Sequence, residues 1–133
     1  MDVLFRKINC DRRLSMREVK FRAWDVGAES MVDWESIKLH FSEHVDHEMV
    51  VVMQYTGLKD KNGKEMYEGD IIYISSGESK NLAEVTFDDG CFCVTGYLGD
   101  PRTYPLKDFL WRGYDIEVIG NRFENPGLMG QCI

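Results

Sequence analysis

Hydrophobic and polar residues alternate along the first patterned segment of the chain. Residues 19–23 are apolar at the odd positions and basic at the even ones, which is the period of a half-buried strand. The Asp-Val-Gly-Ala sequence at 25–28 then predicts a turn. A second apolar run at 49–55, rich in β-branched residues, predicts another strand.

The segment between these two strands fits two patterns. Trp34, Ile37, Phe41 and Val45 share one face of a helix, whereas Ile37, Leu39 and Phe41 share one face of a strand. We expect the strand. The polar residues 42–48 then form the loop of a hairpin that returns through the next apolar run.

Residues that favour turns recur along the chain from Gly57 onward. Asn and Gly tolerate positive φ, so Asp-Lys-Asn-Gly at 60–63 and Asp-Asp-Gly at 88–90 predict tight turns. Short apolar runs lie between such turns. We expect strands at 71–74, 82–87, 91–95 and 116–119, a polar loop at 75–81 and one helical turn at 105–110.

The predicted elements indicate an α+β protein that is mostly β. Several short strands separated by turn signals are typical of a small barrel or sandwich. The order strand, hairpin, short helical turn, strand is that of an SH3-like barrel. This analogy concerns the fold and carries no function.

Composition places the chain among soluble single-domain proteins. Its 133 residues are 44% hydrophobic and suit one compact core. No apolar run approaches the roughly 20 residues of a membrane span. Arg6 and Lys7 interrupt the start of the chain, so no signal peptide is indicated. We therefore expect a cytoplasmic location, reduced cysteines and no membrane partner.

Charge is distributed unevenly along the chain. Residues 1–22 carry seven basic and three acidic side chains, a net charge of +4, whereas the rest carries nine basic and twenty acidic ones, a net charge of −11. An acidic body repels phosphate and argues against duplex binding by the body itself. The basic arm has three open interpretations: contact with nucleic acid, contact with the acidic body of a neighbouring subunit, or a solvated tail.

Three segments together resemble the YopX-like family of phage and prophage proteins. They are MREVKFRAWD at 16–25, MQYTGLKDKNGKEMYEGDI at 53–71, and DIEVIGN at 115–121 followed by ENP at 124–126. The resemblance covers about residues 16–128 and depends on the order and spacing of all three. Residues 30–52 depart from the family in detail.

The resemblance implies a small α+β protein in which an N-terminal part assembles subunits and a C-terminal part is an SH3-like barrel. No agreed biochemical activity comes with the family, so no catalytic residue is carried over, and the resemblance implies a bacterial host. Residues 1–15 lie outside the resemblance, and two interpretations stay open: a disordered extension of the native chain, or residues that precede a natural start at Met16. We expect residues 16–56 to be the assembly subdomain, 57–125 the barrel and 126–133 a tail.

Three histidines are candidate metal ligands. His40, His44 and His47 are spaced so that they would share one face of a helix, where three imidazoles could bind one zinc or nickel ion. The segment is expected to be a loop, however, and the favoured interpretation is a solvated group of titratable side chains. We therefore expect no metal and no other cofactor.

Other candidate groups have simpler explanations. Asp88 and Asp89 precede a glycine and suit a hairpin turn. Cys91 and Cys93 lie two apart on one strand face, too close to bridge comfortably, and no nearby cation would activate them. No catalytic triad, phosphate loop or dinucleotide motif is present.

These observations favour a non-enzymatic, self-associating accessory protein of a phage or prophage. The candidate interface residues lie in and beside the predicted N-terminal strands: Phe21, Arg22, Trp24 and Tyr55. The alternative is a nucleic-acid-associated regulatory factor that uses the basic arm. No small-molecule substrate is indicated.

Overall fold

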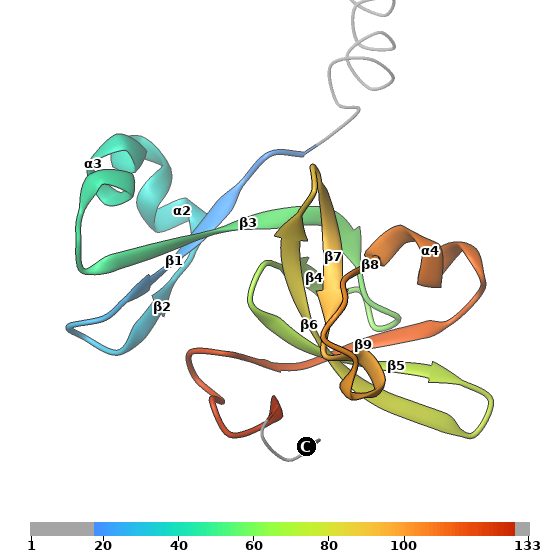
Figure 1. Ribbon diagram of the computed structural model, residues 1–133. Helices are drawn as coiled ribbons and strands as arrows, with labels where there is room; N and C mark the ends of the chain where they lie inside the picture. The colour runs from blue at the N-terminus through green and yellow to red at the C-terminus, as the bar shows by residue number, and fades with distance from the viewer. Residues whose placement is uncertain (1–17, 130–133) are drawn as a thin grey trace, which may run out of the picture.

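A computed structural model describes residues 18–129 of the chain, and Figure 1 shows their arrangement. Its elements form a mostly β α+β fold built on two antiparallel sheets, which confirms the predicted class. No helix in the described part of the chain is long and apolar enough to cross a membrane. The predicted extension at 1–15 lies outside the described residues.

The first sheet has the strand order β2-β1-β3-β4. Its strands are β1 (Phe21–Asp25), β2 (Ser30–Val32), β3 (Val50–Lys59) and β4 (Glu65–Tyr67). The expected strands at 19–23 and 49–55 are therefore present as β1 and β3. Two short strands, β2 and β4, were not expected. They pair with β1 and with the second half of β3.

The predicted hairpin at 34–48 is wrong, because the segment is helical. It forms α2 (Trp34–Ile37), the 3-10 helix η2 (Lys38–His40) and α3 (Phe41–Asp46). Asp33 caps the start by accepting from the backbone N–H of Ser36 at 3.0 Å. The helical face then covers the sheet, because Phe41 stacks on Phe21 with ring centroids 4.7 Å apart.

The second sheet has the order β8-β7-β6-β5-β9. Figure 1 shows it strongly curled, because the long strand β6 follows β5 at one end and rises beside β7 at the other. The short helix α4 (Leu106–Trp111) follows its edge strand β8. The strands are β5 (Asp70–Ser76), β6 (Ser79–Asp88), β7 (Cys91–Thr95), β8 (Tyr104–Pro105) and β9 (Asp115–Asn121).

Turn chemistry explains most of this second sheet. Gly63 and Gly90 have φ near +80° at the two predicted turns. The polar segment 75–81 was expected to be a loop, but its strands continue until Ser76 pairs with Ser79. Glycine at 77, with φ +60°, permits this two-residue connection, so the expected loop is wrong in length.

The main core lies inside the curled sheet. Its ten buried residues come from β4, from the strands of the curled sheet and from α4, whose Leu106 is fully buried. β3 connects the N-terminal strands to this core, because its first half pairs with β1 and its second half with β4. The predicted boundary between 56 and 57 falls inside this strand.

Candidate functional site

The three segments that carry the family resemblance meet at the junction of the two sheets. Arg22 on β1 donates from Nη2 to Asp70 Oδ1 at 2.7 Å, across 48 positions of the sequence. The other oxygen of Asp70 accepts from the backbone N–H of Tyr67 at 2.7 Å. Asp70 is 1% exposed, so this pair is a buried link between the N-terminal sheet and the curled sheet.

The environment of Asp70 indicates a structural role. Burial raises its pKa, while the Arg22 guanidinium and the Tyr67 N–H oppose that shift by binding the charged form. The guanidinium also lies 4.7 Å from the centroid of the Tyr67 ring. The carboxylate therefore has its contacts within the chain and is poorly placed to take part in proton transfer with a substrate.

A second contact joins the turn after β9 to the same place. The backbone N–H of Arg122 donates to the carbonyl oxygen of Gly69 at 2.9 Å. The backbone N–H of Gly69 donates to the carbonyl oxygen of Val85 at 2.8 Å. Gly69 has φ +87°, and a Cβ there would lie 3.5 Å from the Phe123 ring. The Glu-Gly-Asp sequence at 68–70 thus allows close approach of the two segments.

The turn after β9 is held by the side chain of Asn121. Its Oδ1 accepts from the N–H groups of Phe123 and Glu124, at 3.0 and 2.8 Å. Its Nδ2 donates to Glu124 Oε1 at 2.7 Å. Gly120 is required nearby, since a Cβ would lie 2.5 Å from Asn125 Oδ1. The Asn-x-x-Glu-Asn-Pro sequence of the resemblance therefore forms a hydrogen-bonded turn that orients Phe123.

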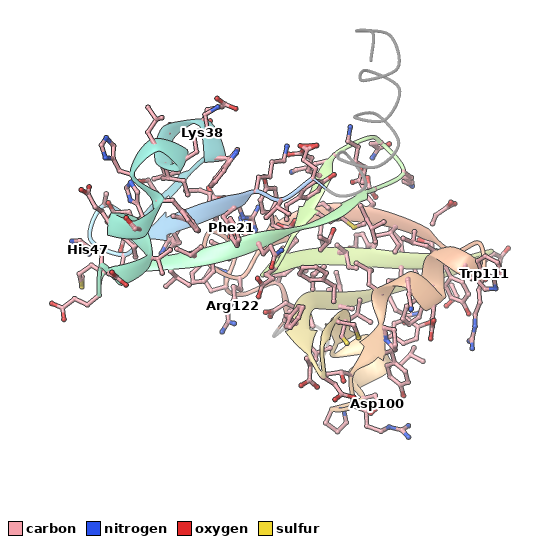
Figure 2. The ribbon with its side chains drawn as sticks, turned by 90° about the horizontal axis from the view of Figure 1, so that it is seen from above. Phe21, Lys38, His47, Asp100, Trp111 and Arg122 are labelled. Atoms are coloured by element: carbon pink, nitrogen blue, oxygen red, sulfur yellow. The ribbon has the colours of Figure 1, made fainter. Side chains whose placement is uncertain are left out.

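Phe123 stacks on Trp24 of β1, with ring centroids 5.6 Å apart and an interplanar angle of 24°. These rings line a surface cavity of about 610 Å³, which we call the Trp24 groove. Figure 2 shows Arg122 at the junction, on the opposite side of β3 from Lys38. The groove is lined by Trp24, Val26, Glu29, Phe123, Glu124 and Pro126.

The groove adjoins the face of the first sheet that is turned away from the helices. The strand register places Met31, Trp24 and Val51 in one row across β2, β1 and β3 on this open face. Val51 is 39% exposed, and Val26 beyond the end of β1 is 43% exposed. The open face therefore presents an apolar row beside an aromatic groove.

The candidate interface residues occupy different environments. Phe21 packs beneath the helices against Trp34 and Phe41, and Tyr55 is buried beside Tyr67. Arg22 forms a buried ion pair with Asp70. Trp24 reaches the open face. Whether any of them contacts another subunit stays a prediction, and the geometry favours Trp24.

Sequence reasoning missed Asp70, Asn121 and Phe123 as residues of this junction. Asp70 and Asn121 lie inside segments that carry the resemblance, which was the available signal. Phe123 lies between two such segments and had none. Its importance follows from the contact with Trp24.

Two basic side chains of residues 1–22 fall in the described part of the chain, and both have acidic partners. Lys20 forms ion pairs with Glu18 and Glu65, which raise the pKa of its ammonium group. Arg22 pairs with Asp70. Residues 18–129 have eleven basic and twenty-one acidic side chains, a net charge of −10.

The three histidines lie on or beside the helices. His40 Nδ1 is 3.9 Å from Glu43 Oε2. His47 Nδ1 accepts from the N–H of Met49 at 3.0 Å, which occupies one of its two ligand positions. Within residues 18–129, no three side chains of His, Cys, Asp or Glu are grouped as a metal site would require.

A second cavity, of about 690 Å³, lies between β3, the β6–β7 hairpin and α4. Cys91 lines it, and its Sγ lies 3.4 Å from that of Cys93. Both thiols are free. Burial and the neighbouring thiol raise the pKa of Cys93 to about 11, so it is a poor nucleophile at neutral pH.

The candidate carboxylate Asp88 accepts a hydrogen bond from the hydroxyl of Thr103 at 3.2 Å.

Comparison with known proteins identifies similar chains. A family model described as YopX protein matches residues 35–130. The crystal structure of protein EF1440 from Enterococcus faecalis is 26% identical, with a TM-score of 0.59, and the match covers 85% of this chain and 99% of that one. Protein yopX from Bacillus subtilis is 23% identical, with a TM-score of 0.53, covers 82% and 96%, and shows likeness of fold. Among curated proteins there is no match.

Proposed function

The chain belongs to the YopX family, and on that premise we propose that it is a phage- or prophage-encoded accessory protein that assembles with copies of itself and has no catalytic activity. The assembly surface is the open face of the N-terminal sheet. We also infer that the curled sheet, together with β4 and α4, is the predicted SH3-like barrel.

The observation that carries this proposal is the apolar row of Met31, Trp24 and Val51. A sheet buries apolar side chains by packing another layer against them. The helices supply that layer on one face, where Phe41 stacks on Phe21 and Ile37 is buried. On the other face Phe123 covers part of Trp24, while Val51 remains 39% exposed. Grouped exposed apolar side chains mark interaction surfaces.

A second copy of the chain suits this surface as the partner. Closed symmetric homo-oligomers are the common assembly of soluble proteins. β2 is an edge strand of three residues that carries Met31 of the apolar row. Its outer side is unpaired within the described residues. Two copies related by a twofold axis would each cover the row of the other.

Size-exclusion chromatography with light scattering on the full chain tests the proposal. We expect a multimer whose ratio of absorbance at 260 and 280 nm is that of protein alone. Val51→Glu should lower the mass, because it places a charge in the apolar row. Leu39→Glu is the matched control, since Leu39 is 84% exposed on the helical side. Its mass should equal that of the wild type.

Two results would overturn the proposal. One is a wild-type monomer at every concentration tested. The other is a wild-type species that carries nucleic acid and dissociates when the nucleic acid is removed, which would support the alternative based on the basic arm. Circular dichroism of both variants establishes that they are folded.

A further inference from the structure

We propose that the Trp24 groove binds basic side chains of a peptide segment, and that this segment is the N-terminal arm, residues 1–17, of a second copy of the chain. The proposal rests on the self-association proposed above and names the element of the partner that the surface receives.

The chemistry of the groove suits an arginine or a lysine. Its floor is the stack of Trp24 and Phe123, flanked by Val26 and Pro126. An aliphatic stem can lie on such a floor while its charged end stays at the edge. Glu29 and Glu124 also line the groove. Among the described residues, neither carboxylate forms an ion pair. Glu124 Oε1 accepts from Asn121 Nδ2 at 2.7 Å, which leaves its other oxygen and the carboxylate of Glu29 for an incoming cation.

Ring faces in this fold are commonly paired with cations. Five basic side chains lie within 6 Å of an aromatic centroid, and one of them is Arg122 over Phe123, the second ring of the groove. In the described part of the chain, no cation lies over Trp24. Tryptophan is the ring that attracts cations most strongly. Trp24 is therefore without a cation partner among the described residues, and two carboxylates line the same groove.

The arm has the complementary charge. Residues 1–17 carry five basic and two acidic side chains, a net charge of +3, against −10 for residues 18–129. Four of the five are arginines, which combine planar stacking with bidentate contact to carboxylates. The adjacent pair Arg12 and Arg13 offers two guanidinium groups to the two glutamates.

The direction of β1 favours a second copy over the same chain. The described chain begins at Glu18, before β1, whereas the groove residues Trp24 and Val26 lie near the other end of that strand. Six extended residues span roughly 20 Å. The chain's own arm would have to turn back along β1. A seventeen-residue segment extends to roughly 55 Å, which is long enough to reach a neighbouring subunit, and only that route makes assembly depend on the arm.

Charge variants of the full chain test the inference. Glu29→Gln with Glu124→Gln removes both carboxylates, and the glutamine at 124 keeps an oxygen to accept from Asn121. Arg12→Gln with Arg13→Gln removes the proposed occupant. By sedimentation velocity, each pair should raise the dissociation constant of the multimer at least about tenfold. Glu43→Gln with Glu78→Gln, both exposed and far from the groove in sequence, is the matched control and should leave it unchanged.

A charge exchange gives the strongest positive result. The arm variant Arg12→Glu with Arg13→Glu should weaken assembly by itself. Mixed with the groove variant Glu29→Arg with Glu124→Arg, it should assemble into mixed multimers, because each has the charge that the other lacks. A synthetic peptide of residues 1–17 should dissociate the wild-type multimer, and the same peptide with glutamine at 12 and 13 should do so less well.

The outcomes separate this inference from the proposed function. A multimer that is insensitive to both charge pairs overturns the arm as occupant and leaves self-association standing. Sensitivity to the groove variants without sensitivity to the arm variants also overturns it, because the groove then holds another segment. A wild-type monomer at every concentration overturns both proposals.

Discussion

Two buried aspartates hold segments of this fold together by accepting hydrogen bonds. Asp60 accepts from the N–H groups of Asn62, Lys64 and Val118, at 2.8 to 2.9 Å, and so joins the turn after β3 to strand β9. Asp70 accepts from Arg22 and Tyr67 and joins the two sheets. Each aspartate lies in the segment 53–71, so this one segment holds both links.

Asp70→Ala should be strongly destabilising. It leaves the Arg22 guanidinium and the Tyr67 N–H without their acceptor in a buried site, and removal of one partner from a buried ion pair costs about 3–5 kcal/mol. Urea denaturation followed by circular dichroism measures the loss. Arg22→Met combined with Asp70→Leu should lose less, because it removes both charges. A midpoint for Asp70→Ala equal to that of the wild type would contradict the structural role.

Asp60 predicts an acid dependence of stability. Burial raises its pKa, but the N–H groups of Val118, Lys64 and Asn62 bind the charged form, and the net pKa is lowered. A carboxylate with a lowered pKa stabilises the fold above its unfolded pKa of about 4, and that stabilisation is lost as pH falls toward the folded value.

Asp60→Asn should therefore flatten the fall in stability below about pH 4. At neutral pH it should cost about 1–3 kcal/mol, because an amide NH₂ replaces one of the acceptors, facing either the Val118 N–H or those of Asn62 and Lys64. Thermal melts of both proteins between pH 2 and pH 7 provide the comparison. An unchanged acid slope in the variant would assign the dependence to other carboxylates.

At the scale of elements, the helical segment and the turn after β9 define the two faces of the first sheet. The helices cover the face of Phe21, and the turn brings Phe123 to the face of Trp24. A local side-chain hydrogen bond fixes the start of each element. The Asp33 side chain caps the helices, and the Asn121 side chain holds the turn. These elements decide which aromatic residues remain accessible.

Gly120→Ala should disrupt the turn that orients Phe123. A Cβ at this position would lie 2.5 Å from Asn125 Oδ1 and 3.0 Å from Leu128 Cδ1. Overpacking of this kind costs about 1–3 kcal/mol. Gly127→Ala is the matched control, since its Cβ would meet no atom within 4 Å. Equal melting temperatures for the two variants would show that the turn adapts freely.

At the scale of the whole molecule, β3 couples the two sheets. It pairs with β1 in its first half and with β4 in its second half, and the buried Arg22–Asp70 pair spans the same junction. The N-terminal sheet therefore cannot separate from the curled sheet without breaking a continuous strand and exposing buried charge.

We expect the chain to unfold in one transition. Far-UV circular dichroism reports all the strands, while Trp24 and Trp34 in the N-terminal region dominate a fluorescence signal that also includes the 91% exposed Trp111. The two curves should coincide in urea, as cooperative unfolding requires. Two separate midpoints would mean that the sheets are independent units.

The sequence by itself determined the family of the chain and most strands and turns between Gly57 and Asn121, but not the short strand β4 or the length of the connection at 77–78. The turns at 60–63 and 88–90 are fixed by residues that tolerate positive φ, and alternation between them is a local signal. The strand Cys91–Thr95 and the helical turn near 105–110 follow from the same local rules. Local chemistry decides these elements whatever the rest of the chain does.

Only the tertiary structure decided the segment at 34–46 and the roles of the aromatic residues. Both a strand and a helix gave that segment an apolar face, and the choice depended on the Phe21 ring, which lies on another element. Phe21, Tyr55 and Trp24 look alike as aromatic residues in strands, yet Tyr55 is buried and Trp24 borders a groove. Burial and long-range pairing depend on contacts between distant positions, such as Arg22 with Asp70, and no local pattern encodes which partner a side chain meets.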